Sequence, residues 1–338
     1  MGEFSMKTLI DSYGRIHRDL RVSLTDRCSL RCTYCLPNDF SDWLPSEHLL
    51  TTEELLIVIA TAVDSGIEEV RLTGGEPLLR PDIINIVERI ANLEKAPKLS
   101  LTTNGLRLLD LAKPLVNAGL TRINVSLDTL DRERFTKITK RDRIADVFSG
   151  LEAARAAGLT PIKINTVLIA GVNDDEAIKL LQWAMNENFE LRFIEQMPLD
   201  AGKIWVRDNL VTANRIFTDL SSEFKLTPVA SRGSSPAEEF YINDSLQKVG
   251  IIASVTEPFC GACDRLRLTS DGQIRSCLFS HDEIDLRKIL RDSSKSSVEI
   301  RQEIAARFQK TVQSKLPGHG INDPKFIQPN RPMSAIGG

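Results

Sequence analysis

Six strand-like segments alternate with helical patterns over residues 20–200 of this 338-residue chain. The expected strands cover residues 20–25, 69–73, 98–102, 121–127, 161–168 and 189–194. Between the first two, residues 52–64 place apolar side chains on one helical face behind a Thr51 and Glu54 capping box, and Gly66 ends the helix. This alternation predicts a parallel sheet, which right-handed crossovers coil into a barrel or an open doubly wound sheet.

Every expected strand has one polar face. In the first strand Arg21 alternates with Leu20 and Val22, and the other strands repeat the pattern. The polar faces include Arg21, Arg71, Thr102, Asn124, Ser126, Lys163 and Asn165, and Arg192 joins them if its strand has the matching face. Helices cover the apolar faces of an α/β protein, so the polar faces point into a common lumen. A closed eight-stranded barrel fills its lumen with branched apolar side chains, so six strands predict an incomplete barrel with an open, wet interior.

The basic residues of this expected lumen indicate a polyanionic ligand. A single charged residue on a strand is more often an exposed edge residue. Because several strands show the same pattern, we expect the basic residues as a set to face the lumen. Unpaired buried charge is too costly to recur without a function.

Composition excludes several other classes of protein. Apolar residues make up 42% and charged residues 26%, which are ordinary globular values. The net charge of −3 gives no global field for nucleic acid or an anionic membrane. The sequence shows neither a run of about 18 apolar residues nor a signal-peptide pattern. We therefore expect a cytoplasmic protein with no nucleic-acid or membrane partner.

The six cysteines form two triplets, of which the first follows the first expected strand. Cys28, Cys32 and Cys35 have CxxxCxxC spacing. Without an export pattern, metal ligation is favoured over disulfides. Structural zinc normally takes four ligands, and neither a histidine nor a fourth cysteine lies close by. Three thiolates suit an iron–sulfur cluster with one open iron, and the alternatives are a zinc knuckle or buried apolar cysteines.

The regular alternation stops after about Met197, and this predicts a second domain. We expect an N-terminal extension over 1–19, the barrel over 20–200 and a smaller α+β domain over 201–338. Within that domain we expect a helix over 212–223, strands over 239–254 and 265–276, and helices over 283–312.

The second triplet, Cys260, Cys263 and Cys277, lies in this C-terminal part. It again supplies three ligands, and its spacing fits zinc and a cluster equally well. Arg265 and Arg267 follow at alternate positions, so on a strand both project to one side. Two guanidinium groups suit phosphate or purine acceptor atoms.

Several motifs resemble those of a known family. CSLRCTYC, with an aromatic residue before its last cysteine, resembles the cluster loop of radical S-adenosylmethionine (SAM) enzymes. Further motifs resemble the GTP 3′,8-cyclase (MoaA) family of molybdenum cofactor biosynthesis: RDLRVSLTDRC, RLTGGEPLLR, LTTNG, INVSLD, CGACDRLRLTSDGQIRSCL and the C-terminal Ile-Gly-Gly. The resemblance runs from about Asp11 to Gly338.

The resemblance implies a fold, cofactors and site residues. The fold is an α/β incomplete (βα)6 TIM-type radical SAM barrel, with a smaller α+β C-terminal domain that binds an auxiliary cluster. The cofactors are two [4Fe–4S] clusters, one on each triplet, and SAM. The implied SAM contacts are Tyr34, Gly75, Glu76, Ser126 and Met197. The implied GTP contacts are Arg21, Arg71, Thr102, Lys163, Arg192, Arg265, Leu266 and Arg267.

Two glycine motifs have ordinary interpretations beside those that the resemblance implies. It implies that Gly337 and Gly338 of the C-terminal tail reach into the active site as catalytic residues. A terminal glycine pair is otherwise most often frayed. Likewise, Gly74-Gly75-Glu76-Pro77 is otherwise an ordinary turn between a strand and a helix.

The implied activity is conversion of GTP to (8S)-3′,8-cyclo-7,8-dihydroguanosine 5′-triphosphate through a 5′-deoxyadenosyl radical. The implied partners are GTP, a flavodoxin- or ferredoxin-like reductant, the downstream MoaC pyranopterin synthase and a second copy in a homodimer. Two alternatives stay open. One is a radical SAM enzyme whose auxiliary cluster serves another substrate, such as a peptide. The other is a non-catalytic protein that binds zinc and a nucleotide.

Overall fold

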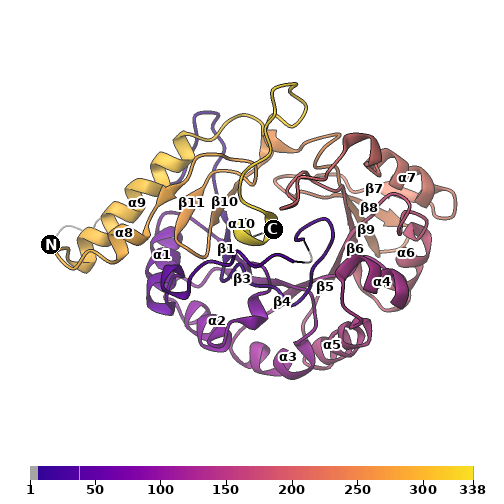
Figure 1. The fold of residues 1–338 in the computed structure, drawn as a ribbon, viewed down its shortest axis with the longest axis horizontal. Coiled ribbons are helices and arrows are strands. Elements are labelled where there is room, and N and C mark those ends of the chain that lie inside the picture. The colour runs from indigo at the N-terminus through magenta and orange to yellow at the C-terminus, as the bar shows by residue number, and fades with distance from the viewer. Residues whose placement is uncertain (1–6, 38, 338) are drawn as a thin grey trace.

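The computed structural model describes residues 7–37 and 39–337. Six parallel strands follow one another around a curved sheet, and helices cover its outer side (Figure 1). The strands are β1 Asp19–Ser23, β2 Glu69–Thr73, β3 Lys98–Thr103, β4 Arg122–Ser126, β5 Ile162–Val167 and β6 Glu190–Ile194. The helices are α1 Thr52–Asp64, α2 Ile83–Ala91, α3 Leu108–Asn117, α4 Arg132–Thr139, α5 Ile144–Ala156 and α6 Ala177–Asn186. The six strands expected from the sequence are confirmed, with ends that differ by no more than two residues.

The alternation within each strand separates an apolar outer face from a polar inner face. Leu20 on β1 and Leu72 on β2 are fully buried in the core beneath the helices. Arg21 pairs in register with Arg71, and Arg71 with Ser100 on β3. The side chains of these three residues therefore lie side by side on the inner face.

Helix α1 begins and ends as expected. The Thr51 hydroxyl accepts the Glu54 N–H at 3.2 Å, and the Glu54 carboxylate accepts the Thr51 N–H at 2.8 Å. These two bonds satisfy N–H groups that have no partner within the helix. Gly66 follows the helix with a φ of +103°, which glycine adopts without strain.

The C-terminal part adds strands to both edges of this sheet. The added strands are β7 Leu226–Pro228, β8 Glu238–Ile242, β9 Lys248–Ile252, β10 Arg265–Leu268, β11 Gln273–Arg275 and β12 Ile284–Asp285. β10 pairs parallel with β1, and β9 pairs parallel with β6. Over the described residues the result is one 12-stranded sheet, ordered β12-β11-β10-β1-β2-β3-β4-β5-β6-β9-β8-β7. The expected boundary near residue 200 thus separates segments of one continuous sheet.

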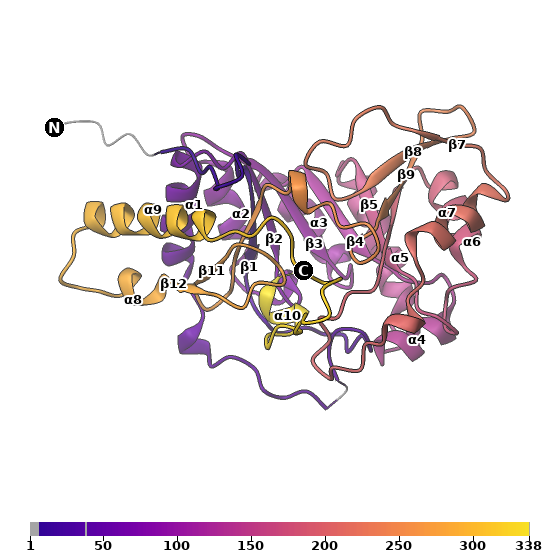
Figure 2. The same cartoon turned by 90° about the horizontal axis from the view of Figure 1, so that it is seen from above.

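The remaining helices lie outside the sheet except at the C-terminus. They are α7 Ala213–Ser221, α8 Arg287–Leu290, α9 Ser297–Gln313 and α10 Met333–Ile336. Four 3-10 turns are η1 Ser46–His48, η2 Pro77–Leu79, η3 Arg207–Asn209 and η4 Cys260–Ala262. Helix α9 lies alongside α1, whereas α10 lies inside the ring of strands (Figures 1 and 2). The chain therefore returns to the centre of the barrel at its end.

Among the residues described, no helix has the length and apolar character needed to cross a bilayer.

Candidate active site

A cavity of about 300 Å³ lies at the carboxyl ends of the central strands, where parallel α/β sheets commonly bind ligands. It brings the first cysteine triplet together with arginines from β10. The expected site residues that line it are Arg21, Cys28, Cys32, Tyr34, Cys35, Arg71, Gly75, Thr102, Ser126, Arg192, Met197, Arg265 and Arg267. One cavity therefore brings together the residues expected to hold the first cluster and SAM and the residues expected to bind GTP.

The glycines after β2 hold the cysteine-bearing loop close to the sheet. A Cβ atom at Gly75 would lie 2.3 Å from the carbonyl oxygens of both Asp26 and Arg27. The Glu76 N–H donates to the Arg27 carbonyl at 2.7 Å. A larger residue at position 75 would collide with backbone, so this glycine sets how closely β2 approaches the loop that bears Cys28.

Glu76 lies behind the glycines and does not line the cavity. Its carboxylate accepts hydrogen bonds from the Thr103 hydroxyl at 2.6 Å, the Asn104 N–H at 2.7 Å and the Leu78 N–H at 3.0 Å. Burial raises the pKa of Glu76 despite these donors. Glu76 therefore connects the ends of β2 and β3 in this structure, and its expected contact with SAM stays a prediction.

Asp128, just after β4, holds the aromatic residue of the cysteine loop. The Tyr34 hydroxyl donates to Asp128 Oδ2 at 2.8 Å, and the Val167 N–H donates to Asp128 Oδ1 at 2.9 Å. Burial raises the pKa of Asp128 to about 6, and the two donors limit the rise. One carboxylate thereby ties the cysteine loop to β4 and β5.

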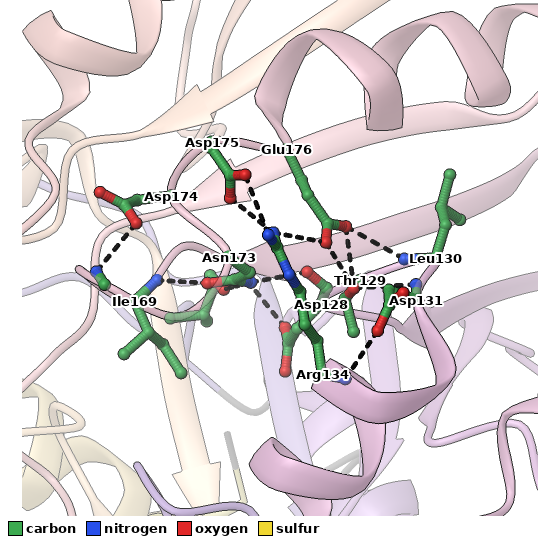
Figure 3. Close-up of polar contacts among 12 residues, drawn as sticks. Asp128, Thr129, Leu130, Asp131, Arg134, Ile169, Asn173, Asp174, Asp175 and Glu176 are labelled. Carbon is green, nitrogen blue, oxygen red and sulfur yellow. Dashed lines mark hydrogen bonds and ion pairs between the residues drawn. The ribbon is translucent and has the colours of Figure 1, made fainter.

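A polar network fixes the backbone beside Asp128 (Figure 3). The Asn173 amide donates to the Asp128 carbonyl at 2.6 Å and to the Val167 carbonyl at 3.0 Å. Glu176 accepts from the Thr129 hydroxyl at 2.8 Å and pairs with Arg134, which also contacts Asp175. These contacts join the loops after β4 and β5, so this wall of the cavity is built before a ligand arrives.

Five arginines give the cavity an excess of positive charge. They are Arg21, Arg71, Arg192, Arg265 and Arg267. Arg21 Nε lies 3.1 Å from Asp19 Oδ1, and Arg192 Nη2 lies 3.5 Å from Glu239 Oε1. Within residues 7–37 and 39–337, Arg71, Arg265 and Arg267 have no carboxylate at ion-pair distance, 4.0 Å or less.

The unpaired guanidinium groups are costly in the folded chain. Burial and the charge of Arg21 lower the pKa of Arg71 and bring that of Arg267 to about 9. The Cζ atom of Arg265 lies 4.6 Å from the centre of the Phe259 ring. Its Nη2 atom is buried and has no hydrogen-bond partner among the described residues. Because buried cations need anionic partners, these groups are placed to bind a polyanion.

The side chains of two residues expected to bind GTP do not line this cavity. The Lys163 ammonium is on the inner face but forms an ion pair with Glu190 and does not line the cavity. The Leu266 side chain is fully buried in the apolar core, because alternation places it opposite Arg265 and Arg267. Any contact of Leu266 with GTP would therefore use its backbone, and the expected contact stays a prediction.

The C-terminal tail reaches the inner face of the sheet. An Arg267 N–H donates to the Gly337 carbonyl. Gly337 has a φ of +81°, and a Cβ atom there would lie 2.9 Å from Thr73 Cγ2 and 3.1 Å from Ser23 Cβ. The tail is thus ordered against β1 and β2 and is not a frayed end. Gly338 lies outside the described residues.

The second cysteine triplet lies beside a separate cavity of about 350 Å³. Cys260, Cys263 and Cys277 line this cavity together with Lys315 and His319. Burial raises the pKa of the Cys263 thiol, but Arg265 and Lys315 outweigh that effect and lower it to about 7. The surroundings of this sulfur therefore favour the thiolate that metal ligation requires.

Both triplets fit an iron–sulfur cluster. None of the six cysteines forms a disulfide. Among the described residues no group of three His, Cys, Asp or Glu side chains is placed to hold a single metal ion. Burial raises the pKa of Cys28 to about 11 and that of Cys35 to about 12, so without a metal group these thiols keep their protons, and ligation would require their loss. The cavities leave room for such a group at each triplet.

Sequence reasoning missed the residues that support the cysteines. Asp128 follows Ser126 by two residues and so continues the same alternation, but the pattern gives no sign of its bond to Tyr34. Lys315 and Asn104 also contact cysteine sulfurs, at 3.5 Å from Cys263 and 3.9 Å from Cys28. The LTTNG motif contains Asn104, so it offered a signal, whereas nothing in the sequence around Lys315 did.

Comparisons with known proteins match both parts of the chain to known families. The family model described as Radical SAM superfamily matches residues 22–184, and that described as Molybdenum Cofactor Synthesis C matches residues 189–321. The GTP 3′,8-cyclase of Streptomyces coelicolor is 56% identical over 333 residues, covering 98% of this chain and 96% of its own. That of Mycolicibacterium smegmatis is 52% identical over 336 residues, covering 98% and 92%.

A solved structure supports the fold alone. SuiB of Streptococcus suis, bound to its precursor peptide SuiA, superposes with a TM-score of 0.56 at 15% identity. The match covers 83% of this chain and 66% of SuiB. The α/β fold with a mostly parallel sheet and an added C-terminal part is therefore shared. The two family models, together with two cyclases that are 56% and 52% identical over 98% of this chain, show that the chain belongs to the GTP 3′,8-cyclase family of radical SAM enzymes.

Proposed function

We propose that this chain converts GTP to (8S)-3′,8-cyclo-7,8-dihydroguanosine 5′-triphosphate, the first step of molybdenum cofactor biosynthesis. The observation that carries the proposal is the cavity that joins the first cysteine triplet to three arginines that have no carboxylate partner in the described part of the chain. A nucleoside triphosphate supplies the negative charge that Arg71, Arg265 and Arg267 lack. A neutral peptide would leave these cations unpaired, so the cavity favours the nucleotide over that alternative.

The family implies a [4Fe–4S] cluster and SAM, which supply a one-electron cleavage that starts radical chemistry when bound. Cys28, Cys32 and Cys35 would hold this cluster, and the Tyr34 to Asp128 bond fixes the loop that carries them. Gly75, Ser126 and Met197 line the same cavity and would contact SAM. The second triplet would hold an auxiliary cluster.

The protein's contribution to the reaction is positioning. The arginines bind and orient the triphosphate, so that the ribose C3′ and guanine C8 of one substrate molecule are held for ring closure. The tail, with Gly337 accepting from Arg267, covers part of the opening of the barrel and restricts water. Net ring closure leaves the product an isomer of GTP, since the hydrogen lost from C3′ is balanced by one gained on the guanine ring.

An anaerobic assay tests the proposal. The chain reconstituted with iron and sulfide is incubated with SAM, dithionite and GTP, and products are separated chromatographically before mass spectrometry. We expect 5′-deoxyadenosine together with a GTP isomer that has a new retention time. 5′-Deoxyadenosine without the isomer would contradict the substrate assignment, and zinc without iron after reconstitution would favour the non-catalytic alternative.

The remaining partners stay predictions. We infer a flavodoxin- or ferredoxin-like reductant, transfer of product to a MoaC-type synthase, a homodimer and a cytoplasmic site of action. Sedimentation of the purified chain measures the oligomeric state, and a coupled assay with the synthase measures product transfer.

A further inference from the structure

Lys315 is a buried lysine that has no acidic partner among the described residues. Lys315 comes shortly after the end of α9, and its side chain lines the second cavity. The residue is 5% exposed. Its Nζ donates to the Arg265 carbonyl at 2.7 Å and lies 3.5 Å from Cys263 Sγ. In the part of the chain that the structure describes, no carboxylate comes within 4.0 Å of this ammonium group.

Because the neighbouring carboxylate is already paired, the cysteine thiolates are the anions that can balance the charge of Lys315. Asp11 is a buried carboxylate near His17, and it already contacts Arg15 at 2.5 Å and His17 at 3.1 Å. Arg15 in turn donates to the Cys260 carbonyl at 2.7 Å, so it anchors the cysteine loop through its backbone. Since a buried cation needs a nearby anion, the sulfur of Cys263 is the group that the Lys315 ammonium is placed to neutralise.

We propose that Lys315 is a positioning residue of the second cysteine triplet, which donates a hydrogen bond to the Cys263 sulfur and raises the reduction potential of the cluster bound there. The inference rests on the proposed function, which places a cluster at this triplet. A positive charge and an N–H donor beside a ligand sulfur stabilise the reduced cluster, which carries one more negative charge. Lys315 would also hold Cys263 in position during cluster assembly.

Arg265 lies beside the same sulfur but gives a less clear test. It lines the substrate cavity, so its replacement would alter GTP binding as well. Lys315 lines only the second cavity of the two, so its replacement removes no side chain from the substrate cavity.

The experiment measures the potential of the second cluster without turnover. The parent is the full-length chain with C28A, C32A and C35A substitutions, which leaves only the second triplet to bind iron. K315M, K315R and the exposed control K310M are made in this parent and reconstituted. Iron content and an EPR-monitored redox titration are recorded for each. We expect a lower potential in K315M, a potential near that of the parent in K315R, and no change in K310M.

Each outcome decides between the alternatives. K315M with full iron content and an unchanged potential would overturn the inference. If K315M binds little iron, K315Q replaces it, because glutamine keeps an N–H donor without the charge. A lower potential in K315Q than in K315R supports the inference, and equal potentials overturn it. If the parent binds no iron, the second triplet does not hold a cluster, and the proposed function fails at that point. This result is known before any lysine variant is compared.

Discussion

In the described part of the chain, the guanidinium group of Arg71 contacts a neutral hydroxyl group. Its Nε donates to Ser100 Oγ at 3.1 Å, and it lines the cavity beside Arg21. We expect R71M to weaken GTP binding by about 10- to 100-fold, because one charge-assisted bond to phosphate is lost. The free energy of unfolding should not fall, since the variant removes an unpaired charge. Anaerobic calorimetry and denaturant titration measure the two quantities.

The control for Arg71 is an exposed arginine with an ordinary ion pair. Arg18 Nε lies 3.2 Å from Glu68, and both side chains are more than half exposed. R18M should leave GTP affinity unchanged. Equal affinities for R71M and the unmodified chain would show that the inner-face arginines do not bind the triphosphate.

His17 links the stability of the fold to pH. Its side chain is fully buried, and burial together with the charge of Lys315 lowers its pKa to about 4, although the bond to Asp11 acts to raise it. The unfolded histidine binds a proton below about pH 6.5, whereas the folded one stays neutral down to about pH 4. Stability that is present above pH 6.5 is therefore lost as the pH falls towards 4.

The H17Q variant isolates this effect. Between pH 7 and pH 5 the unmodified apo-protein should lose about 2 kcal/mol more free energy of unfolding than H17Q does. The exposed His48 provides the control, and H48Q should behave like the unmodified chain. Urea titrations at pH 7, 6 and 5 give the comparison, and parallel curves for H17Q and the unmodified chain would contradict the buried neutral histidine.

At the scale of elements, the turn after β2 and the cysteine loop act as one packed unit. A Cβ atom at Gly75 would lie 2.3 Å from two backbone carbonyl oxygens, which cannot yield as a flexible side chain does. G75A should therefore displace the loop that bears the first triplet and remove about half of the bound iron, while the second triplet keeps its cluster. Iron analysis with EPR spectroscopy measures the loss.

Gly202 gives a matched control for Gly75. A Cβ atom there would meet its nearest neighbours at 3.5 and 3.6 Å, which are ordinary contacts. G202A should keep the full iron content. Full occupancy in G75A would mean that the loop can move away from β2 without losing its cluster.

How far the sequence predicts these elements depends on the range of the contacts. The strands β1 to β6 and the polar inner face follow from alternation within short segments, and the first cysteine triplet follows β1 as expected. The roles of Asp128 and Lys315 depend on contacts with residues far away in sequence, which no local pattern shows. Lys163 was correctly placed on the inner face, but its ion pair with Glu190 depends on the register of β5 against β6.

At the scale of the whole molecule, the pairing of the sheet edges was not visible in the sequence. The expectation of a barrel over 20–200 and a second domain over 201–338 treats the two parts as separate. In the structure β10 covers the edge of β1 and β9 covers the edge of β6, so both edges of the six-stranded sheet are paired with the C-terminal part. Such pairings join segments with no shared local signal, and short strands within loops give weak patterns.

This pairing predicts that residues 1–200 alone do not form a stable barrel. Without the C-terminal part, β1 and β6 would expose unpaired backbone N–H and carbonyl groups at both edges, and exposed edges promote association between chains. We expect the 1–200 fragment to aggregate on size-exclusion chromatography, and residues 201–338 supplied by co-expression to restore a species with native-like circular dichroism. If the fragment alone is monomeric and unfolds cooperatively, the parallel core is sufficient for folding, and the C-terminal strands then serve mainly to bring Arg265 and Arg267 to the cavity.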